Sequence, residues 1–224
     1  GLSVSALYAG TAVLSIAAGW LNDRFGVRGT LAAGQILLGV AILAATRADS
    51  FGPFLLSLFL AGLPYSAIAP ATAKALVDWF PARERGTAMA MKQTGFTLGG
   101  MAAAAVAPSV ALVAGWNTAL GLAGILPLLA GLLVLLAYRD RQSTPMIIAP
   151  GTAVQEASRN VGRVMTDPIL VALALAAFLL GTQQSALLAY MALFFNEAVH
   201  LDVVLAGGLV AVMQASGTIS RLVF

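Results

Sequence analysis

The chain has 224 residues, of which 60% are hydrophobic and only 9% are charged, and its mean hydropathy is +0.92. Soluble domains carry about 25% charged residues, so this composition excludes an ordinary water-soluble enzyme and predicts an exterior that faces lipid. In such a protein the formal net charge of +3 reports loop topology, and no nucleic-acid partner is expected. The chain has no cysteine, which excludes disulfides and thiolate metal sites. Neither a metal nor another cofactor is expected.

Seven apolar stretches are long enough, or nearly so, to cross a bilayer as helices of roughly 20 residues. Short polar segments separate most of them, so consecutive helices are expected to be antiparallel neighbours. The predicted spans are 1–21, 29–46, 51–79, 86–112, 116–138, 168–195 and 203–224. The sequence therefore predicts an all-α, polytopic membrane helix bundle. Because apolar sequence starts at residue 1 and residues 220–224 read as mid-helix, the chain is expected to be a fragment without a signal peptide.

The longest polar segment is 139–167, which contains four arginines. Within it, Thr152 to Thr166 has the spacing of a helix that lies on a membrane surface, and a regulatory or partner-binding role is the alternative. Asp167-Pro168 is expected to open the next span, since proline fits the first turn of a helix. Eight arginines fall on one side of the predicted topology and only Arg47 on the other. The positive-inside rule therefore places 139–167 in the cytoplasm.

The most specific local signal joins the first two predicted spans, with the sequence Gly19-Trp20-Leu21-Asn22-Asp23-Arg24-Phe25-Gly26-Val27-Arg28. Gly19 is expected to let a neighbouring helix approach closely, and Gly26 to permit a tight reversal. Asp23 is an anion with which a helix N-terminus or an arginine can pair. Arg24 and Arg28 are expected to hold the loop at the cytoplasmic headgroups. An ordinary cytoplasmic loop would explain the arginines but not two spaced glycines around an acid.

This stretch resembles the G-x-x-x-D-R-x-G-x-R loop of the major facilitator superfamily, which joins that family's second and third helices. Residues 78–86 look like the W-F-P-x-x-E-R-G junction between helices 4 and 5 of its organic-anion members. The resemblance implies the major facilitator fold, with seven of an expected twelve transmembrane helices present. It divides the chain into an N-terminal bundle lacking its first helix (1–138, helices 2–6), a cytoplasmic linker (139–167) and the start of a C-terminal bundle (168–224, helices 7–8). A monomer in a bacterial inner membrane is expected.

The chain departs from the family's proton antiporters at two places. Those members carry an arginine in helix 4, near residues 57–58 here, and a Gly-Pro pair in helix 5; this chain has neither at the matching positions. The resemblance therefore does not extend to drug–proton antiport. In helix 5, Gly95 and Gly99 form a G-x-x-x-G pattern, which is expected to allow close helix packing.

Two lysines lie inside predicted spans, where an unpaired charge is costly. Lys74 precedes Asp78 by four residues, so an i,i+4 ion pair or snorkelling to the interface is expected. Lys92 lies about six residues, or roughly 9 Å, inside its span. It either snorkels or, together with Gln93, faces a central cavity and binds an anion. The segment from Lys92 to Gly95 looks like one found in some bacterial anion and organic-acid permeases of the superfamily.

Three further polar residues lie near the middle of predicted spans: Tyr65, Gln183 and Gln184. In the family, helices 1, 4, 7 and 10 line the transport pathway, so the resemblance implies that these side chains line it too. The alternative is that they form hydrogen bonds between helices.

The polar residues of the chain distinguish between the remaining classes of membrane protein: enzymes, channels, retinal proteins and transporters. The sequence has no His-Glu pair or facing carboxylates of a membrane-embedded enzyme, no channel filter motif, and no lysine in its last span for a Schiff base. No enzyme activity is expected. The predicted function is secondary active or facilitative transport of a small solute, an organic or small inorganic anion, by alternating access. The alternative is a non-transporting receptor or sensor built on the same fold.

Overall fold

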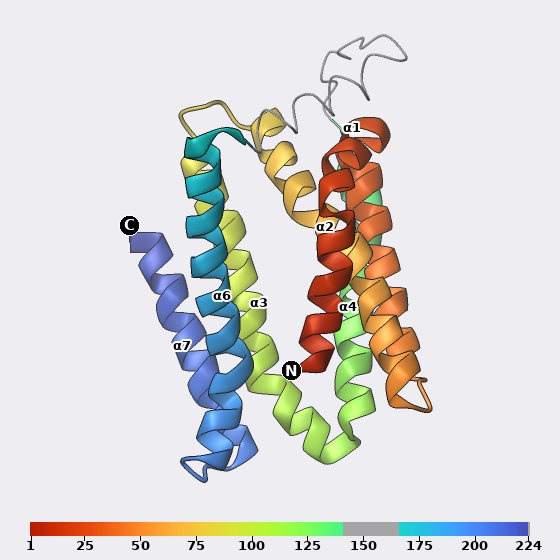
Figure 1. Cartoon of the computed structure of the whole chain (residues 1–224), viewed down its shortest axis with the longest axis vertical. Coiled ribbons are helices and arrows are strands. Elements are labelled where there is room, and N and C mark those ends of the chain that lie inside the picture. Colours follow the sequence, from red (N-terminus) through yellow and green to blue (C-terminus); the bar gives the residue numbers. More distant parts are fainter. Residues whose placement is uncertain (141–165, 224) are drawn as a thin grey trace. The chain divides into compact units, whose positions relative to one another are not determined.

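The structure is a computed structural model that describes residues 1–140 and 166–223. In these residues every regular element is an α-helix, which confirms the all-α prediction. The helices are α1 (Leu2–Ala45), α2 (Phe51–Trp79), α3 (Arg85–Ala114), α4 (Trp116–Ala137), α6 (Pro168–Glu197) and α7 (Val203–Val223) (Figure 1). The surface helix expected at 152–166 lies, except for its last residue, outside the described residues.

The first two predicted spans are both contained in α1, which reverses its direction within the loop motif (Figure 1). The reversal occurs at Gly26, whose φ of 72° and ψ of 168° are not helical. Side chains disfavour this combination, so glycine is the residue that fits it. The tight turn expected at Gly26 is confirmed.

Six segments of the described part are long and apolar enough to cross a membrane, judged by length and composition. They are Ala17–Ala45, Phe51–Trp79, Arg85–Ala114, Trp116–Ala137, Pro168–Leu187 and Val203–Ser220. The N-terminal stretch, expected to be a seventh span, contains a shorter apolar helix, Leu2–Ser15. Many large apolar side chains are exposed, up to 90% at Val113, as is expected of helices that face lipid.

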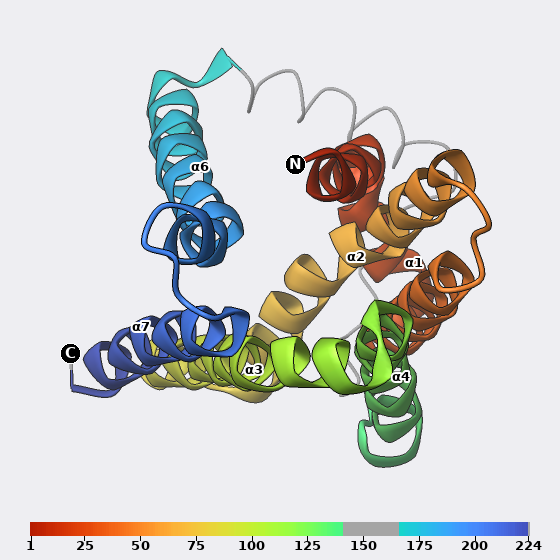
Figure 2. The same cartoon turned by 90° about the horizontal axis from the view of Figure 1, so that it is seen from below.

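The chain divides into two compact units: residues 1–141 with 203–224, and residues 142–202. In the first unit α1 packs against α2 and α4, while α3 packs against α7. Figure 2 shows these neighbours from below, with α3 and α7 side by side. The second unit contains α6, which begins where the sequence predicted. Asp167 caps it by accepting hydrogen bonds from the N–H groups of Ile169 and Leu170. The division at 138 and 168 that the resemblance implies stays a prediction.

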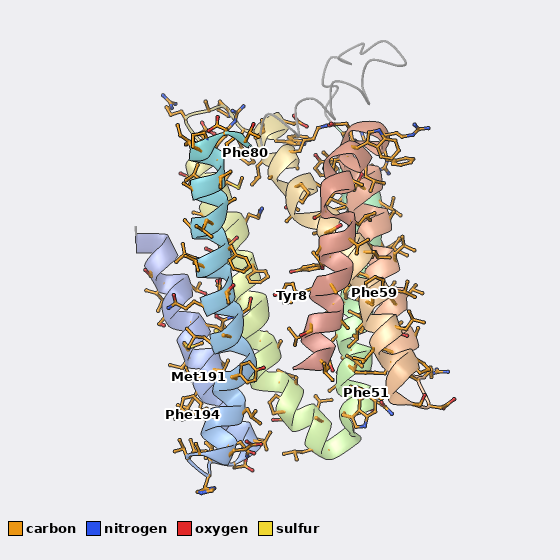
Figure 3. All side chains as sticks on the ribbon, viewed as in Figure 1. Tyr8, Phe51, Phe59, Phe80, Met191 and Phe194 are labelled. Carbon is orange, nitrogen blue, oxygen red and sulfur yellow. The ribbon has the colours of Figure 1, made fainter. Side chains whose placement is uncertain are left out.

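The contact between α1 and α2 depends on two glycines. A Cβ added at Gly10 would lie 2.0 Å from the carbonyl oxygen of Phe59, and one added at Gly62 would lie 2.0 Å from that of Leu7. Figure 3 labels Phe59 on α2 at this crossing. At these two positions only a hydrogen atom fits between the backbones. The two glycines therefore determine where α2 crosses the first half of α1.

The contact between α3 and α7 uses other small residues than those the sequence suggested. A Cβ added at Gly95 or Gly99 would meet no heavy atom within 4 Å, so the close packing expected there is wrong for the part of the chain that the structure describes. Instead, an added Cβ at Gly207 would lie 2.5 Å from the carbonyl oxygen of Ala104. The buried Thr218 hydroxyl donates a hydrogen bond to Oγ1 of Thr97 at 2.7 Å.

Candidate functional site

The loop motif around Gly26 lies at one end of the first unit, which also carries Arg24, Arg28, Arg85 and Arg139; we call it the basic end. Asp140, just after α4, accepts a hydrogen bond from the backbone N–H of Arg28 at 2.9 Å. The guanidinium of Arg28 donates to the carbonyl oxygen of Leu135. The bond to Asp140 satisfies the backbone N–H group of Arg28, which lies at the start of the second half of α1 and would otherwise lack a helical partner. The end of α4 therefore holds the reversal in place.

Asp23 is paired with a residue of α2. Its Oδ1 lies 2.5 Å from Nζ of Lys74, with the two side chains 74% and 36% exposed respectively. This corrects two expectations. Within the described residues Asp23 forms its ion pair with a lysine, where an arginine or a helix N-terminus was expected. Lys74 forms its ion pair with Asp23, where an i,i+4 pair with Asp78 was one of the two alternatives. The reason is tertiary, because the crossing of α1 and α2 brings the motif loop beside the last turns of α2.

The remaining motif residues have different environments. Arg24 is exposed, and its guanidinium carbon lies 5.3 Å from the ring centre of Trp20, a cation–π arrangement. Arg28 is held by the protein through its bond to Leu135. Gly19, expected to admit a close neighbour, is exposed, and an added Cβ would meet nothing within 4 Å in the described residues. That expectation is therefore wrong here.

Two polar residues of this region were not singled out from the sequence. Asn22 is only 2% exposed. Its Nδ2 donates to the carbonyl oxygen of Ala18, while its buried Oδ1 accepts no hydrogen bond from the part of the chain that the structure describes. The signal for it was present, since an amide side chain directly precedes Asp23. Asp140 had no such signal, because its contact with Arg28 spans 112 positions of the chain.

Lys92 and Gln93 lie on α3, in the turns that follow its start at Arg85. The side chain of Lys92 is half-buried and that of Gln93 is exposed. Within the described residues, Lys92 makes no ion pair or hydrogen bond. The acidic residues described lie at helix ends, in loops or beside the Gly26 reversal, so none of them belongs to the central part of a span.

The other predicted lining residues lie on other helices. Tyr65 is half-buried on α2, between two prolines of that helix. Gln183 and Gln184 are exposed on α6, in the second unit. Gln183 borders a pocket of about 500 Å³ along α6; Met191 and Phe194, labelled in Figure 3, border the same pocket. Gln183 and Gln184 thus belong to the second unit, whereas Lys92, Gln93 and Tyr65 belong to the first.

Comparison with known proteins decides the family. The model of the Major Facilitator Superfamily matches residues 1–224. The chain belongs to the major facilitator superfamily. This confirms the resemblance carried by the Gly26 loop and the Trp79 junction, and an integral membrane protein follows from the family together with the apolar helices.

Relatives of this superfamily member include both transporters and a sensor. It is 25% identical to the membrane sensor protein UhpC of Salmonella typhimurium over 100% of this chain and 54% of the relative. It is 31% identical to the probable sulfoacetate transporter SauU of Cupriavidus necator over 62% of this chain and 33% of the relative. It is 29% identical to the 4-hydroxybenzoate transporter PcaK of Pseudomonas putida over 60% of this chain and 30% of the relative. The chain thus spans about half the length of these relatives, or less.

Proposed function

We propose that the protein containing this chain transports a small organic or inorganic anion across a bacterial inner membrane by alternating access. The observation that carries the proposal is the position of Lys92: a half-buried cation within an apolar span, without an acidic partner in the described residues. A charge at such a place is costly unless something pairs with it, and charges inside spans mark substrate pathways. A bound carboxylate, sulfonate or inorganic anion would supply the pairing charge.

The depth of Lys92 supports this role. It lies seven residues after the start of α3, which is about 10 Å along a helix that rises 1.5 Å per residue. Snorkelling could return the ammonium to the interface, but the same reach would let it meet an anion that enters from the basic end. The substrates after which two relatives are named, sulfoacetate and 4-hydroxybenzoate, are both anions at neutral pH, as a lysine site requires.

The contacts at the basic end support a conformational role for the motif loop. The Asp23–Lys74 pair is exposed, and exposed ion pairs contribute roughly 0.2–1 kcal/mol. A contact of that strength can break and re-form during each transport cycle, while still shifting the balance between two conformations. We therefore assign Asp23, Lys74, Arg28 and Asp140 to holding one conformation, and we place the basic end in the cytoplasm.

The remaining residues of the proposal complete the pathway. Gln93 adjoins Lys92 on α3, Tyr65 lies on α2, and Gln183 with Gln184 lies on α6. Amide and phenol groups supply the directional hydrogen bonds that orient a small ligand. We propose that all four side chains line the pathway of a monomeric transporter.

The test is equilibrium binding of sulfoacetate and of 4-hydroxybenzoate to the purified full-length protein, with uncharged 4-hydroxybenzyl alcohol as the control ligand. Lys92→Gln should weaken binding of the anion at least tenfold, while Lys92→Arg should retain part of it because the charge survives. Arg47→Gln, which removes a charge at the opposite end of α1, is the matched control and should bind like the parent. If Lys92→Gln binds the anion as tightly as the parent, the proposed site is wrong.

The alternative function, that of a non-transporting sensor, is favoured by one observation: the match to the sensor UhpC covers 100% of this chain. A sensor would bind an anion without moving it. Uptake into proteoliposomes separates the two functions: a transporter accumulates or equilibrates the bound anion, and a sensor leaves the interior empty while binding persists.

A further inference from the structure

A groove lies between the end of α2 and the end of α4, at the basic end of the first unit. Its volume is about 460 Å³, within the range of about 300–1,000 Å³ that small-molecule sites occupy. The residues that form it include Ala75, Leu76, Trp79, Phe80, Tyr138 and Arg139. Figure 3 shows Phe80 at this end of the bundle. Its lining is almost entirely apolar, with charge only at one corner.

The groove is built on the core of the first unit. Tyr138 and Ala75, one on each wall, pack against the buried cluster of Val27, Leu31 and Ala71. The second half of α1 therefore underlies both walls. Trp79 and Phe80 remain 46% and 39% exposed. The groove thus combines a fixed base with aromatic side chains at the level where tryptophan and tyrosine favour the membrane interface.

The polar corner offers donors for an anionic group. Nε1–H of Trp79 donates a hydrogen bond to Oη of Tyr138 at 3.2 Å, and the two rings meet edge to face. Burial raises the pKa of Tyr138, with a smaller contribution from the negative charges of Asp140 and Asp78, although the hydrogen bond from Trp79 lowers it. The hydroxyl therefore keeps its proton and remains a donor. Arg139 is exposed and makes no ion pair or hydrogen bond within the described residues.

The charged residue of the groove lining is a cation, Arg139. Asp140 already accepts a hydrogen bond from the Arg28 backbone. Across the groove, the guanidinium of Arg85 donates to the carbonyl oxygens of Phe80 and Val77 at 3.2 Å. Charges of both signs therefore flank the groove, with Glu84 next to Arg85, while the charged side chain of the lining itself is Arg139.

We propose that this groove binds one anionic phospholipid, with an acyl chain along the apolar walls and the headgroup phosphate at Arg139 and the hydroxyl of Tyr138. A soluble anion would use the polar corner but would gain nothing from the apolar walls. A lipid in the leaflet at the basic end uses both, and basic pockets between transmembrane helices are where such headgroups bind. The proposal is independent of which solute the protein transports.

The experiment measures quenching of Trp79 fluorescence in a variant of the full-length protein in which Trp20, Trp116 and any further tryptophan are replaced by phenylalanine. The protein is placed in nanodiscs that contain either phosphatidylglycerol or phosphatidylcholine with equally brominated acyl chains. Phosphatidylglycerol should quench at about fivefold lower mole fraction, which corresponds to roughly 1 kcal/mol for one arginine near the surface. The measured quantity is the ratio of the mole fractions at which phosphatidylcholine and phosphatidylglycerol quench equally. Arg139→Gln should bring this ratio close to one, and Arg139→Lys should leave it between one and the parent value. Tyr138→Phe should lower the ratio less than Arg139→Gln does.

The matched control is Arg83→Gln, which removes the same charge from an exposed residue between α2 and α3 and should leave the ratio unchanged. Equal quenching by the two lipids in the parent protein would overturn the proposal, since Trp79 would then only touch bulk bilayer. Absence of quenching by either lipid would also overturn it, because another segment of the full protein would then cover the groove. If the Arg139 and Arg83 variants lose the preference for phosphatidylglycerol equally, the preference comes from general surface charge. That result would contradict a lipid site in the groove.

Discussion

Nζ of Lys74 and Oδ1 of Asp23 are 2.5 Å apart, although 51 positions separate the two residues in the chain. The pair joins the last turns of α2 to the loop in which α1 reverses. On the other side of that loop, Asp140 holds the backbone of Arg28. The reversal is thus held by an ion pair to α2 and by hydrogen bonds to the end of α4. Each of these two contacts can be removed separately by mutation.

Removing either charge of the ion pair should loosen the basic end without unfolding the protein. In the full-length protein, Asp23→Asn and Lys74→Gln should each change the free energy of unfolding by less than about 1 kcal/mol, the upper range for exposed pairs. Each should raise the alkylation rate of a cysteine placed at the buried Ala71 by up to roughly fivefold, the same free energy expressed as a rate ratio.

The exchanged pair, Asp23→Lys with Lys74→Asp, should bring the alkylation rate back toward the parent value. Arg24→Gln is the control, because Arg24 stacks on Trp20 outside the pair. If both single variants alkylate at the parent rate, the ion pair does not hold the conformation.

The backbone of Gly26 predicts a second effect. An added Cβ would lie 2.8 Å from Oδ2 of Asp140, and φ is 72°. Gly26→Ala should therefore lower the free energy of unfolding by about 1–3 kcal/mol, the cost of a side chain in a strained backbone region. Thermal unfolding in detergent measures it. Gly19→Ala is the matched control: that glycine is helical and meets nothing within 4 Å, so alanine should leave the stability unchanged or raise it by up to about 1 kcal/mol. Equal losses in both variants would contradict the strain argument.

The crossing of α1 and α2 should tolerate no side chain on Gly62. Since an added Cβ would lie 2.0 Å from the carbonyl oxygen of Leu7, Gly62→Ala must push the helices apart. Overpacking of this kind costs about 1–3 kcal/mol, and the Lys74–Asp23 pair should open with it. Gly99→Ala on α3 has open space and serves as the comparison. The thermal midpoints of the two variants decide the matter: a Gly62 variant as stable as the Gly99 variant would show that the crossing is looser than described.

The proposed orientation can be tested by thiol labelling, because this chain has no cysteine of its own. In a cysteine-free form of the full-length protein, cysteines at Ser50 and Asn117, both exposed at the end opposite the basic end, should react with an impermeant reagent added outside intact cells. A cysteine at the exposed Ala82 should react only after the membrane is opened. Labelling of Ala82 in intact cells, with Ser50 and Asn117 protected, would reverse the topology.

Local chemistry could be predicted from the sequence. The apolar runs specified the helices, because in lipid a backbone must satisfy its own hydrogen bonds. The turn at Gly26 and the start of α6 at Asp167-Pro168 followed from residues within a few positions of each other. The motif residues pointed to the superfamily for the same reason, since their spacing is short and fixed.

Pairings between helices were decided only by the tertiary structure. Lys74 had a nearby acid at Asp78, yet the crossing at Gly10 and Gly62 brings Asp23 to it instead. Asp140 carries no local pattern, and it meets Arg28 only because α4 packs along the second half of α1. Spacing along a chain limits which residues share a turn of helix, whereas partners on different helices depend on where small residues let the backbones approach.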